Sequence, residues 1–315
     1  MPGKQSKSKI KLNPLKFKHP LFTANGDRRA DVTLTNLRTL WFNTGSLCNI
    51  TCKNCFMDSS PTNIQIAYLS LAEVKSYLAE IELESLRVEE IAFTGGEPFM
   101  NQDIIDMMDI SLQKGYRVLV LTNAMKPLLN KRHLLSPLLK KFSSNLILRV
   151  SIDHFTQILH EVVRGKDTWK PMIEGIRWLS EAGANITVAG RTCWKETESD
   201  LRKGYENLFA TERISVNADD PTALVLFPEM DLTADVPEIT TLCWDVLNVA
   251  PESLMCATSR MIVKHKGASR TSVMPCTLLP YDLAFKLGES LISANKTVQL
   301  NHPHCAKFCV LGGAT

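Results

Sequence analysis

The sequence predicts an α/β fold in which parallel strands alternate with helices. Six apolar segments of five to eight residues, separated by helical stretches, lie between residues 37 and 227. Regular alternation of this kind is typical of parallel strands joined by crossover helices. The segments are apolar almost throughout, as expected for strands covered on both faces. Barrels, closed or partly closed, and doubly wound sheets both fit this pattern.

Each element follows from local signals. Apolar and aromatic runs predict strands at 37–43, 90–94, 116–122, 145–152, 185–189 and 223–227. Ser70 and Glu73 form a capping box that opens the first helix. Further helices are expected at 103–114, 128–142, 168–182 and 196–210, with Gly115 and Gly183 ending two of them.

Unusual polar groups follow the strands. Three cysteines come after the first strand, a Gly-Gly-Glu-Pro turn after the second, and Thr122 and Asn123 after the third. Ser151 and Asp153 end the fourth strand, and Arg191 follows the fifth. The carboxyl ends of parallel strands meet at one edge, which is where sites lie in such folds. We therefore expect one site at this edge.

Length, charge and hydropathy limit the possible domain organisation. The chain has 315 residues, a net charge of +3 and no run near 18 apolar residues, so no membrane association is expected. Residues 1–35 are interpreted as a basic tail and lead-in without a secretory signal, 36–230 as the core domain, and 231–315 as a small metal-binding domain. The basic tail is the only support for nucleic acid, which is not expected as a partner. We expect a cytoplasmic protein.

The cysteines are bunched in a way that predicts metal ligation. Cys48, Cys52 and Cys55 lie within eight residues, and the total of nine cysteines is odd. Thiolates select iron–sulfur clusters, zinc or copper(I). A cubane cluster normally takes four thiolates, so three would leave one iron open for a substrate or cofactor. Zinc remains the alternative, although its sites favour two separated pairs of ligands.

Together, the cysteine loop at 48–55 and the turn Gly95-Gly96-Glu97-Pro98 resemble the radical S-adenosylmethionine enzymes. The resemblance extends over residues 37–230 and implies a partial (β/α)6 TIM-like barrel. It implies a [4Fe-4S] cluster on the three cysteines, S-adenosylmethionine on the open iron, and cleavage to a 5′-deoxyadenosyl radical. One departure is Asn54, which stands where the family usually has an aromatic residue; the aromatic, Phe56, follows Cys55.

The resemblance also assigns the strand-end residues. The turn 95–98 would receive the methionyl amine, Ser151 and Asp153 the ribose, and Arg191 the methionyl carboxylate. Asn123 would border the same pocket. Alternatives are a tight structural turn, simple helix caps for Ser151 and Asp153, and a surface ion pair for Arg191.

A second cysteine group lies near the C-terminus. Its members are Cys256, Cys276, Cys305 and Cys309, and the surrounding sequence resembles the SPASM or twitch extensions that carry an auxiliary cluster. A hairpin of 261–264 and 271–274, joined through Gly267, is expected between the first two cysteines. Four ligands suffice for one further [4Fe-4S] cluster. Zinc is a competitor here, with His302 and His304 available for a mixed site.

The remaining candidates are less specific. Cys193 and Cys243 lack partners at metal spacing and are interpreted as small apolar residues. Asp219, Asp220 and Glu229 are acidic groups near the same edge that would position a substrate amine or act as a base.

Two functions remain open. One is a radical enzyme with a peptide, protein or small metabolite as substrate and an electron donor such as flavodoxin or ferredoxin. The other is a non-catalytic iron–sulfur or zinc protein for electron transfer or scaffolding. The convergence of the strand-end residues on a three-ligand cluster favours the enzyme.

Overall fold

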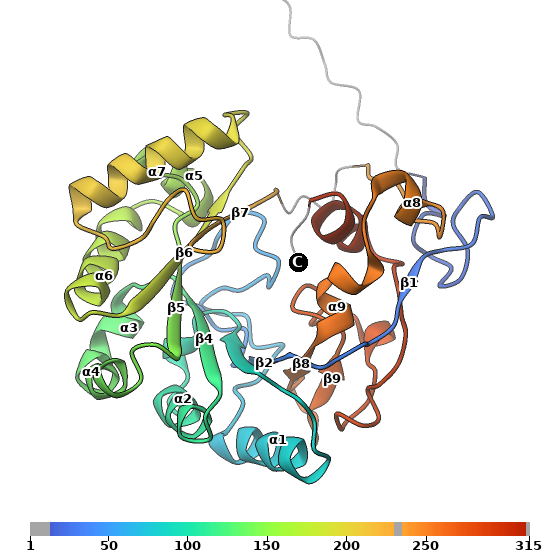
Figure 1. Cartoon of the computed structure of the whole chain (residues 1–315), viewed down its shortest axis with the longest axis horizontal. Coiled ribbons are helices and arrows are strands. Elements are labelled where there is room, and N and C mark those ends of the chain that lie inside the picture. Colours follow the sequence, from blue (N-terminus) through green and yellow to red (C-terminus); the bar gives the residue numbers. More distant parts are fainter. Residues whose placement is uncertain (1–12, 230–234, 313–315) are drawn as a thin grey trace, which may run out of the picture.

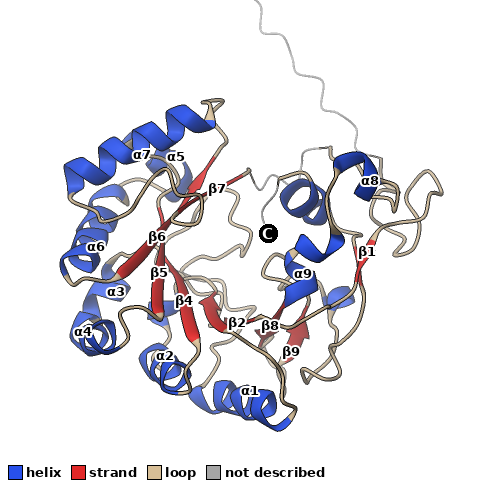
Figure 2. Cartoon of the chain, viewed as in Figure 1, coloured by secondary structure: helices blue, strands red, loops and turns tan. Residues whose placement is uncertain are grey.

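A computed structural model describes residues 13–229 and 235–312. Its main sheet has eight strands in the order β7-β6-β5-β4-β3-β2-β8-β9. All neighbours are parallel except β8 and β9. The strands form an open arc with helices along its outer side (Figures 1 and 2). The partial TIM-like barrel expected from the sequence is confirmed.

The strand predictions agree closely with the structure. The main sheet contains β2 Thr39–Asn43, β3 Glu90–Thr94, β4 Arg117–Thr122, β5 Leu146–Ser151, β6 Asn185–Arg191, β7 Leu224–Phe227, β8 Ser259–Val263 and β9 Ser272–Met274. A separate two-stranded sheet pairs β1 Asp31–Val32 with β10 Val298–Gln299. The register Trp41↔Ala92 and Phe42↔Phe93 brings the carboxyl ends of β2 and β3 level.

The helices agree less uniformly. They are α1 Leu71–Leu83, α2 Ile104–Gln113, α3 Lys126–Asn130, α4 Arg132–Lys141, α5 Gln157–Arg164, α6 Trp169–Glu181, α7 Glu198–Glu212, α8 Cys243–Leu247, α9 Met255–Thr258 and the π-helix Cys305–Val310. Ser70 caps α1 with the predicted capping box. The single helix expected over 128–142 is two helices that meet at Lys131, and α5 was not predicted.

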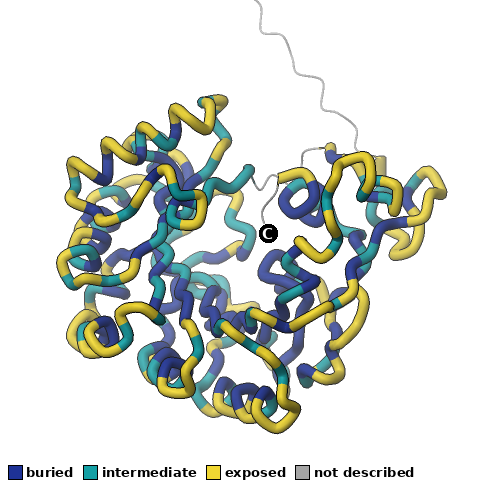
Figure 3. Tube along the Cα trace, viewed as in Figure 1, coloured by how far each residue is buried: buried dark blue, intermediate teal, exposed yellow. Residues whose placement is uncertain are grey.

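Buried positions concentrate on the strands and on the inward sides of the helices (Figure 3). Phe42 stacks on Phe93 with ring centroids 5.8 Å apart, and Tyr77 of α1 packs edge-on against Phe42 at 6.2 Å. Fully burying such side chains contributes about 1.5–3 kcal/mol each. None of the described helices combines the length and apolar character needed to cross a membrane.

The C-terminal residues share the core sheet. The predicted hairpin forms as β8 and β9, and β8 pairs with β2. Helix α1 also contacts the C-terminal residues. The Tyr77 hydroxyl lies 2.7 Å from the Thr271 hydroxyl, and Lys264 forms an ion pair with Glu73 at 2.6 Å. The predicted boundary at residue 230 lies outside the described residues, and the division into two domains stays a prediction.

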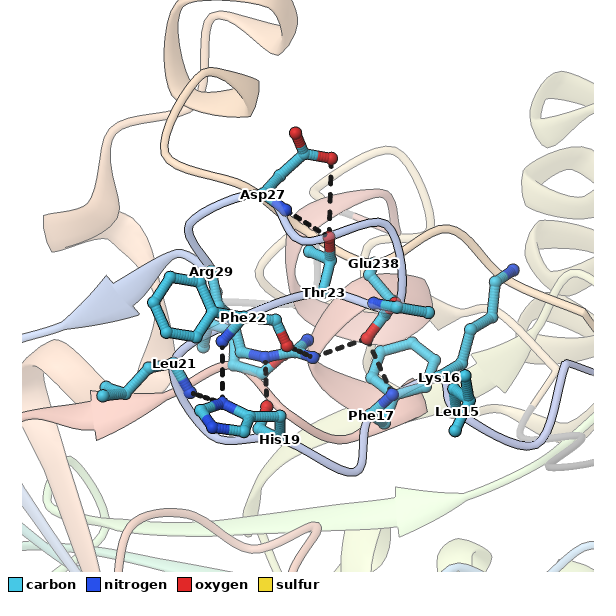
Figure 4. A network of polar contacts seen from close by, with 12 residues as sticks. Leu15, Lys16, Phe17, His19, Leu21, Phe22, Thr23, Asp27, Arg29 and Glu238 are labelled. Carbon is cyan, nitrogen blue, oxygen red and sulfur yellow. Dashed lines mark hydrogen bonds and ion pairs between the residues drawn. The ribbon is translucent and has the colours of Figure 1, made fainter.

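Residues 13–35 do not form a frayed tail. Arg29 is 1% exposed, and its guanidinium donates to the Glu238 carboxylate at 2.5 Å and to the carbonyls of His19, Phe22 and Leu300 (Figure 4). Glu238 also accepts the backbone amides of Phe17 and Ala24. The lead-in is therefore fastened by a buried, fully bonded ion pair, while residues 1–12 lie outside the described part of the chain.

We predict that Glu238→Gln lowers the free energy of unfolding by about 3 kcal/mol, since it leaves the Arg29 charge buried without a carboxylate. Urea unfolding followed by circular dichroism measures the loss. The control is Asp235→Asn, which removes the more exposed ion pair with Lys16 and should cost less than about 1 kcal/mol. Equal losses in the two variants would contradict the prediction.

Candidate functional site

The three N-terminal cysteines meet at the carboxyl edge of the sheet. Cys48, Cys52 and Cys55 line a cavity of about 630 Å³. Other lining residues come from the segment after the cysteine loop, from the ends of β3 to β6 and from α5: Ser59, Thr94, Gly95, Gly96, Thr122, Asn123, Ser151, Arg164 and Arg191. We call this space the core cavity. It gathers residues predicted from five separate segments.

The two glycines of the turn let it approach the cysteine loop. The Gly96 amide donates to the Gly45 carbonyl at 2.8 Å, and the Glu97 amide donates to the Leu47 carbonyl at 3.1 Å. A Cβ atom on Gly96 would lie 2.1 Å from the Leu47 carbonyl oxygen, and Gly95 has a φ of +143°. Only glycine fits such positions. The turn therefore supports the cysteine loop directly, as well as bordering the core cavity.

Glu97 and Pro98 do not line the core cavity, and their expected part in binding the methionyl amine stays a prediction. The Glu97 carboxylate is buried and accepts the Thr122 hydroxyl at 2.9 Å and the Asn123 amide at 2.8 Å. Burial raises its pKa to about 7, although these hydrogen bonds favour the charged form. Through these hydrogen bonds, Glu97 connects the end of β3 to the end of β4. Its side chain lies beside the core cavity without lining it.

Asn123 and Ser151 both lie on the cavity wall, and the expected contact of Ser151 with a ribose stays a prediction. The Asn123 side chain donates to the Asn49 side-chain oxygen at 2.9 Å and lies 3.9 Å from the Cys48 sulfur. Its own oxygen accepts the Met125 amide. Asn123 therefore connects the end of β4 with the cysteine loop.

Asp153 and Arg191, predicted to contact different parts of a cofactor, contact one another. The Arg191 Nε lies 3.0 Å from Asp153 Oδ1, and the Arg164 Nε lies 2.5 Å from Asp153 Oδ2. Burial alone would raise the pKa of Asp153, but the two guanidinium groups hold it below its ordinary value. Asp153 is 3% exposed and does not line the core cavity, whereas both arginines do. Asp153 thus forms a buried link between α5 and β6, and its expected contact with a ribose stays a prediction.

Arg164 was not predicted as a site residue. It ends α5, and the amide of Lys53 in the cysteine loop donates to the neighbouring Val163 carbonyl at 2.7 Å. The charges of Asp153, Cys52 and Cys55 raise its pKa despite its burial, so the guanidinium stays charged. The sequence signal that could have placed a helix terminus here is Gly165, which directly follows Arg164. In the structure Gly165 has a φ of +100° at the end of α5.

The cysteine thiols of the core cavity suit a metal cluster. Burial raises the pKa of Cys48 to about 12, and burial raises the pKa of Cys52 against the opposing charge of Arg164. Without metal, these groups therefore stay protonated at neutral pH. Metal binding deprotonates such thiols. Three soft donors in one partly enclosed space fit the three-thiolate cluster implied by the sequence.

Asn54 has a structural reason to replace the expected aromatic residue. Its φ is +53°, a left-handed conformation that asparagine tolerates better than most residues. Its side-chain amide donates to Glu229 at 2.8 Å, and Glu229 lies 3.4 Å from Arg191. This departure from the family pattern therefore links the cysteine loop to the segment after β7.

The four C-terminal cysteines also meet in one place. Cys256 of α9, Cys276 after β9, and Cys305 and Cys309 of the π-helix line a second cavity of about 350 Å³. Apart from these thiols and His304, its walls are apolar: Leu254, Met255, Leu278, Leu279, Val298 and Leu300. We call it the C-terminal cavity. The donor set of four thiols fits a four-iron cluster.

Burial dominates the chemistry of this second cavity. Burial raises the pKa of Cys256 to about 12 and that of Cys276 to about 11, and it raises those of Cys305 and Cys309 well above their ordinary value. Burial lowers the pKa of His304 to about 4, so its ring is neutral. His302 does not line the cavity. No three His, Cys, Asp or Glu side chains in residues 13–229 and 235–312 are arranged to hold a single metal ion.

The other candidates lie outside both cavities. Cys193 is half-buried beside Glu229, and burial together with that carboxylate raises its pKa to about 12. Cys243 accepts a hydrogen bond from the Thr240 amide. Asp219 is exposed, and Asp220 caps the turn at Thr222. Only Glu229 among the acidic candidates reaches the network around Arg191.

An open parallel barrel with three thiols after its first core strand and a glycine turn after the second defines the class of radical S-adenosylmethionine enzymes. The model of the Radical SAM superfamily matches residues 42–207 of this chain. The match covers more than half of the chain, and the protein belongs to this superfamily. It is an enzyme of this class.

The chain is also similar to individual members of this superfamily. The chain is 29% identical over 143 residues to the antilisterial bacteriocin subtilosin biosynthesis protein AlbA of Bacillus subtilis (strain 168), a match that covers 45% of this chain and 30% of AlbA. Streptococcus suis SuiB bound to S-adenosylmethionine superposes with a TM-score of 0.57 at 11% identity, over 81% of this chain and 63% of SuiB. The anSMEcpe structure with bound AdoMet gives a TM-score of 0.57 at 15% identity, over 84% and 81%. The two structures share the fold, and the chain spans less than two thirds of AlbA and of SuiB.

We predict that Asp153→Asn lowers the free energy of unfolding by about 3 kcal/mol at pH 7, because two buried guanidinium groups lose their shared carboxylate. The folded pKa of Asp153 lies below its ordinary value of about 3.9, so its contribution is complete above that value. The contribution is lost as the pH falls through the folded pKa. Urea unfolding at several pH values, followed by circular dichroism under anaerobic conditions, measures both effects.

The matched control is Asp219→Asn, which removes an exposed carboxylate and should change the stability by less than about 0.5 kcal/mol. The difference between wild type and Asp153→Asn should stay constant from pH 7 to pH 5 and shrink only at lower pH. A loss as small as the control's would show that the bridge contributes nothing.

Proposed function

We propose that this enzyme binds a [4Fe-4S] cluster through Cys48, Cys52 and Cys55 and uses it to cleave S-adenosylmethionine reductively. The observation that carries the proposal is the core cavity, in which three thiols share one space with the ends of four neighbouring strands. When bound, the cluster would supply one electron for cleavage of the carbon–sulfur bond, and a 5′-deoxyadenosyl radical would abstract hydrogen from the substrate.

The protein's own residues would bind and orient S-adenosylmethionine. Gly95 and Gly96 offer a wall without side chains, so backbone can approach the methionyl group. Asn123 and Ser151 supply polar side chains on the same wall. Arg191 faces the cavity with a guanidinium that suits the methionyl carboxylate, although it must share this group with Asp153. Arg164 supplies a second fixed positive charge beside Cys52.

We extend the proposal to a second [4Fe-4S] cluster on Cys256, Cys276, Cys305 and Cys309. Four thiols line one cavity, and no three metal-binding side chains among the described residues are arranged around a single ion, which supports a cluster of several irons over a single zinc ion. The division into a core domain at 36–230 and an auxiliary-cluster domain at 231–315 belongs to this proposal. A small reducing protein such as flavodoxin or ferredoxin would supply electrons, and a reducing cytoplasm suits nine free thiols.

For the substrate, we propose a peptide. AlbA is named as a biosynthesis protein for the bacteriocin subtilosin, and SuiB has been solved with the precursor peptide SuiA. A structure of anSMEcpe with the Cp18Cys peptide has a TM-score of 0.54 to this chain. The competing function is a non-catalytic iron–sulfur protein, which would leave the polar groups of the core cavity without a use.

Anaerobic reconstitution tests the two clusters. We predict about eight irons per chain for the wild type and about four for Cys276→Ala, since each cubane holds four. The Cys276→Ala chain should still cleave S-adenosylmethionine with a strong reductant, while Cys48→Ala should produce no 5′-deoxyadenosine. Cys243→Ala is the control and should keep about eight irons. A fully loaded chain that releases neither 5′-deoxyadenosine nor methionine would refute the proposed reaction.

The peptide proposal has its own test. Peptides encoded beside the gene are incubated with the loaded enzyme, S-adenosylmethionine and dithionite. We predict that one of them increases the rate of 5′-deoxyadenosine formation and changes in mass, and that Cys48→Ala abolishes the mass change. Stimulation by small metabolites alone, with every peptide unchanged in mass, would contradict a peptide substrate.

A further inference from the structure

Two arginines of this chain are buried almost completely. Arg29 and Arg260 are each 1% exposed, and both donate several hydrogen bonds to backbone carbonyls. Arg29 has a negative partner, because Glu238 lies 2.5 Å from its guanidinium (Figure 4). Arg29 therefore shows how this fold neutralises a buried cation when a carboxylate is available.

Arg260 has a different environment. It lies in β8, and its guanidinium donates to the carbonyls of Cys256 at 2.6 Å, Ser259 at 2.8 Å, Ala294 at 3.1 Å and Lys296 at 3.1 Å. These bonds give each of its three nitrogen atoms at least one acceptor and fix its orientation. Carbonyl dipoles do not cancel its charge, however, and no carboxylate forms an ion pair with Arg260 within residues 13–229 and 235–312.

A buried guanidinium without a counter-ion is costly, because the protein interior does not replace the hydration that the charge loses. The ionisable groups that act on Arg260 from the cavity side are the thiols of Cys256 and Cys276, which would carry negative charge only when they bind metal. Both cysteines line the C-terminal cavity, and Arg260 bonds to the backbone of the first of them. The missing counter-charge therefore lies on the side of this cavity.

We infer that Arg260 is the fixed counter-ion of an anionic cluster in the C-terminal cavity and raises the reduction potential of that cluster. This role rests on the second cluster of the proposed function. A four-iron cluster with four thiolates is a net anion that gains one further negative charge on accepting an electron. A buried cation beside it stabilises the reduced form more than the oxidised form, and net charge is one of the factors that set such potentials.

The test measures the C-terminal cluster alone. In a chain with Cys48, Cys52 and Cys55 replaced by alanine, the reduced cluster is followed by electron paramagnetic resonance as dithionite and mediators lower the potential. We expect Arg260→Met to disfavour reduction at least tenfold, a shift of about 59 mV toward more negative potential for one electron. Arg260→Lys, which keeps the charge, should remain closer to the parent.

Arg270→Gln is the matched control, because it removes a positive charge from the same hairpin at a site that is 79% exposed. Its potential should equal the parent's, since water screens the charge. An unchanged potential in an intact Arg260→Met cluster would overturn the inference, and so would equal shifts for Lys and Met.

If the Arg260→Met chain takes up no iron, the iron content of the Arg260 variants is measured in place of the reduction potential. Loading of Arg260→Lys together with failure of Arg260→Gln would support the charge, and failure of both would overturn it. A parent chain without about four irons would overturn both the second cluster and this role of Arg260. Cleavage of S-adenosylmethionine by the first cluster is measured separately in the wild type and is not affected by that result.

Discussion

The close approach of two backbones, at the ends of β2 and β3, is the constraint on which the core cavity depends. The hydrogen bond from Gly96 to Gly45 holds the turn against the cysteine loop, with no space for a side chain between them. Glu97 extends this contact to the end of β4 through Thr122 and Asn123. Contacts within the protein alone thereby fix the ends of these three strands. They also fix Cys48, because the neighbouring Leu47 carbonyl accepts the Glu97 amide.

Charge neutralisation organises the rest of the interior. Asp153 holds Arg164 and Arg191 at the wall of the core cavity, and Glu238 holds Arg29 in the N-terminal lead-in. Each carboxylate is buried with its cation, so the pair fixes geometry at the cost of desolvation. Arg260 departs from this rule, and the departure lies beside the four C-terminal cysteines. Because the other buried arginine, Arg29, has a carboxylate partner, the absence of one at Arg260 in the described part of the chain indicates that an anionic ligand would bind beside it.

The sequence predicted the strands and their functional ends well, since apolar runs and glycine turns are local signals. It missed α5, whose exposed Ile158 and Val162 hide the helical pattern, and with it Arg164. It could not show that Glu97 and Asp153 are bonded within the protein, because the partners of a buried carboxylate lie far away in sequence. The pairing of β8 with β2 depends on contacts between residues more than 200 positions apart, which no local pattern encodes.

The two cysteine sites are joined by specific contacts as well as by the shared sheet. The Tyr281 hydroxyl donates to the Met57 carbonyl at 2.6 Å, which connects the segment after Cys276 to the loop of Cys55. On the other side, Phe227 at the end of β7 stacks on Phe308 of the π-helix, with ring centroids 5.4 Å apart. Phe308 lies between Cys305 and Cys309, so the helix that carries these two cysteines packs against the end of β7. Phe227 is in turn the register partner of Arg191, which lines the core cavity, so a short chain of direct contacts runs from one cysteine site to the other.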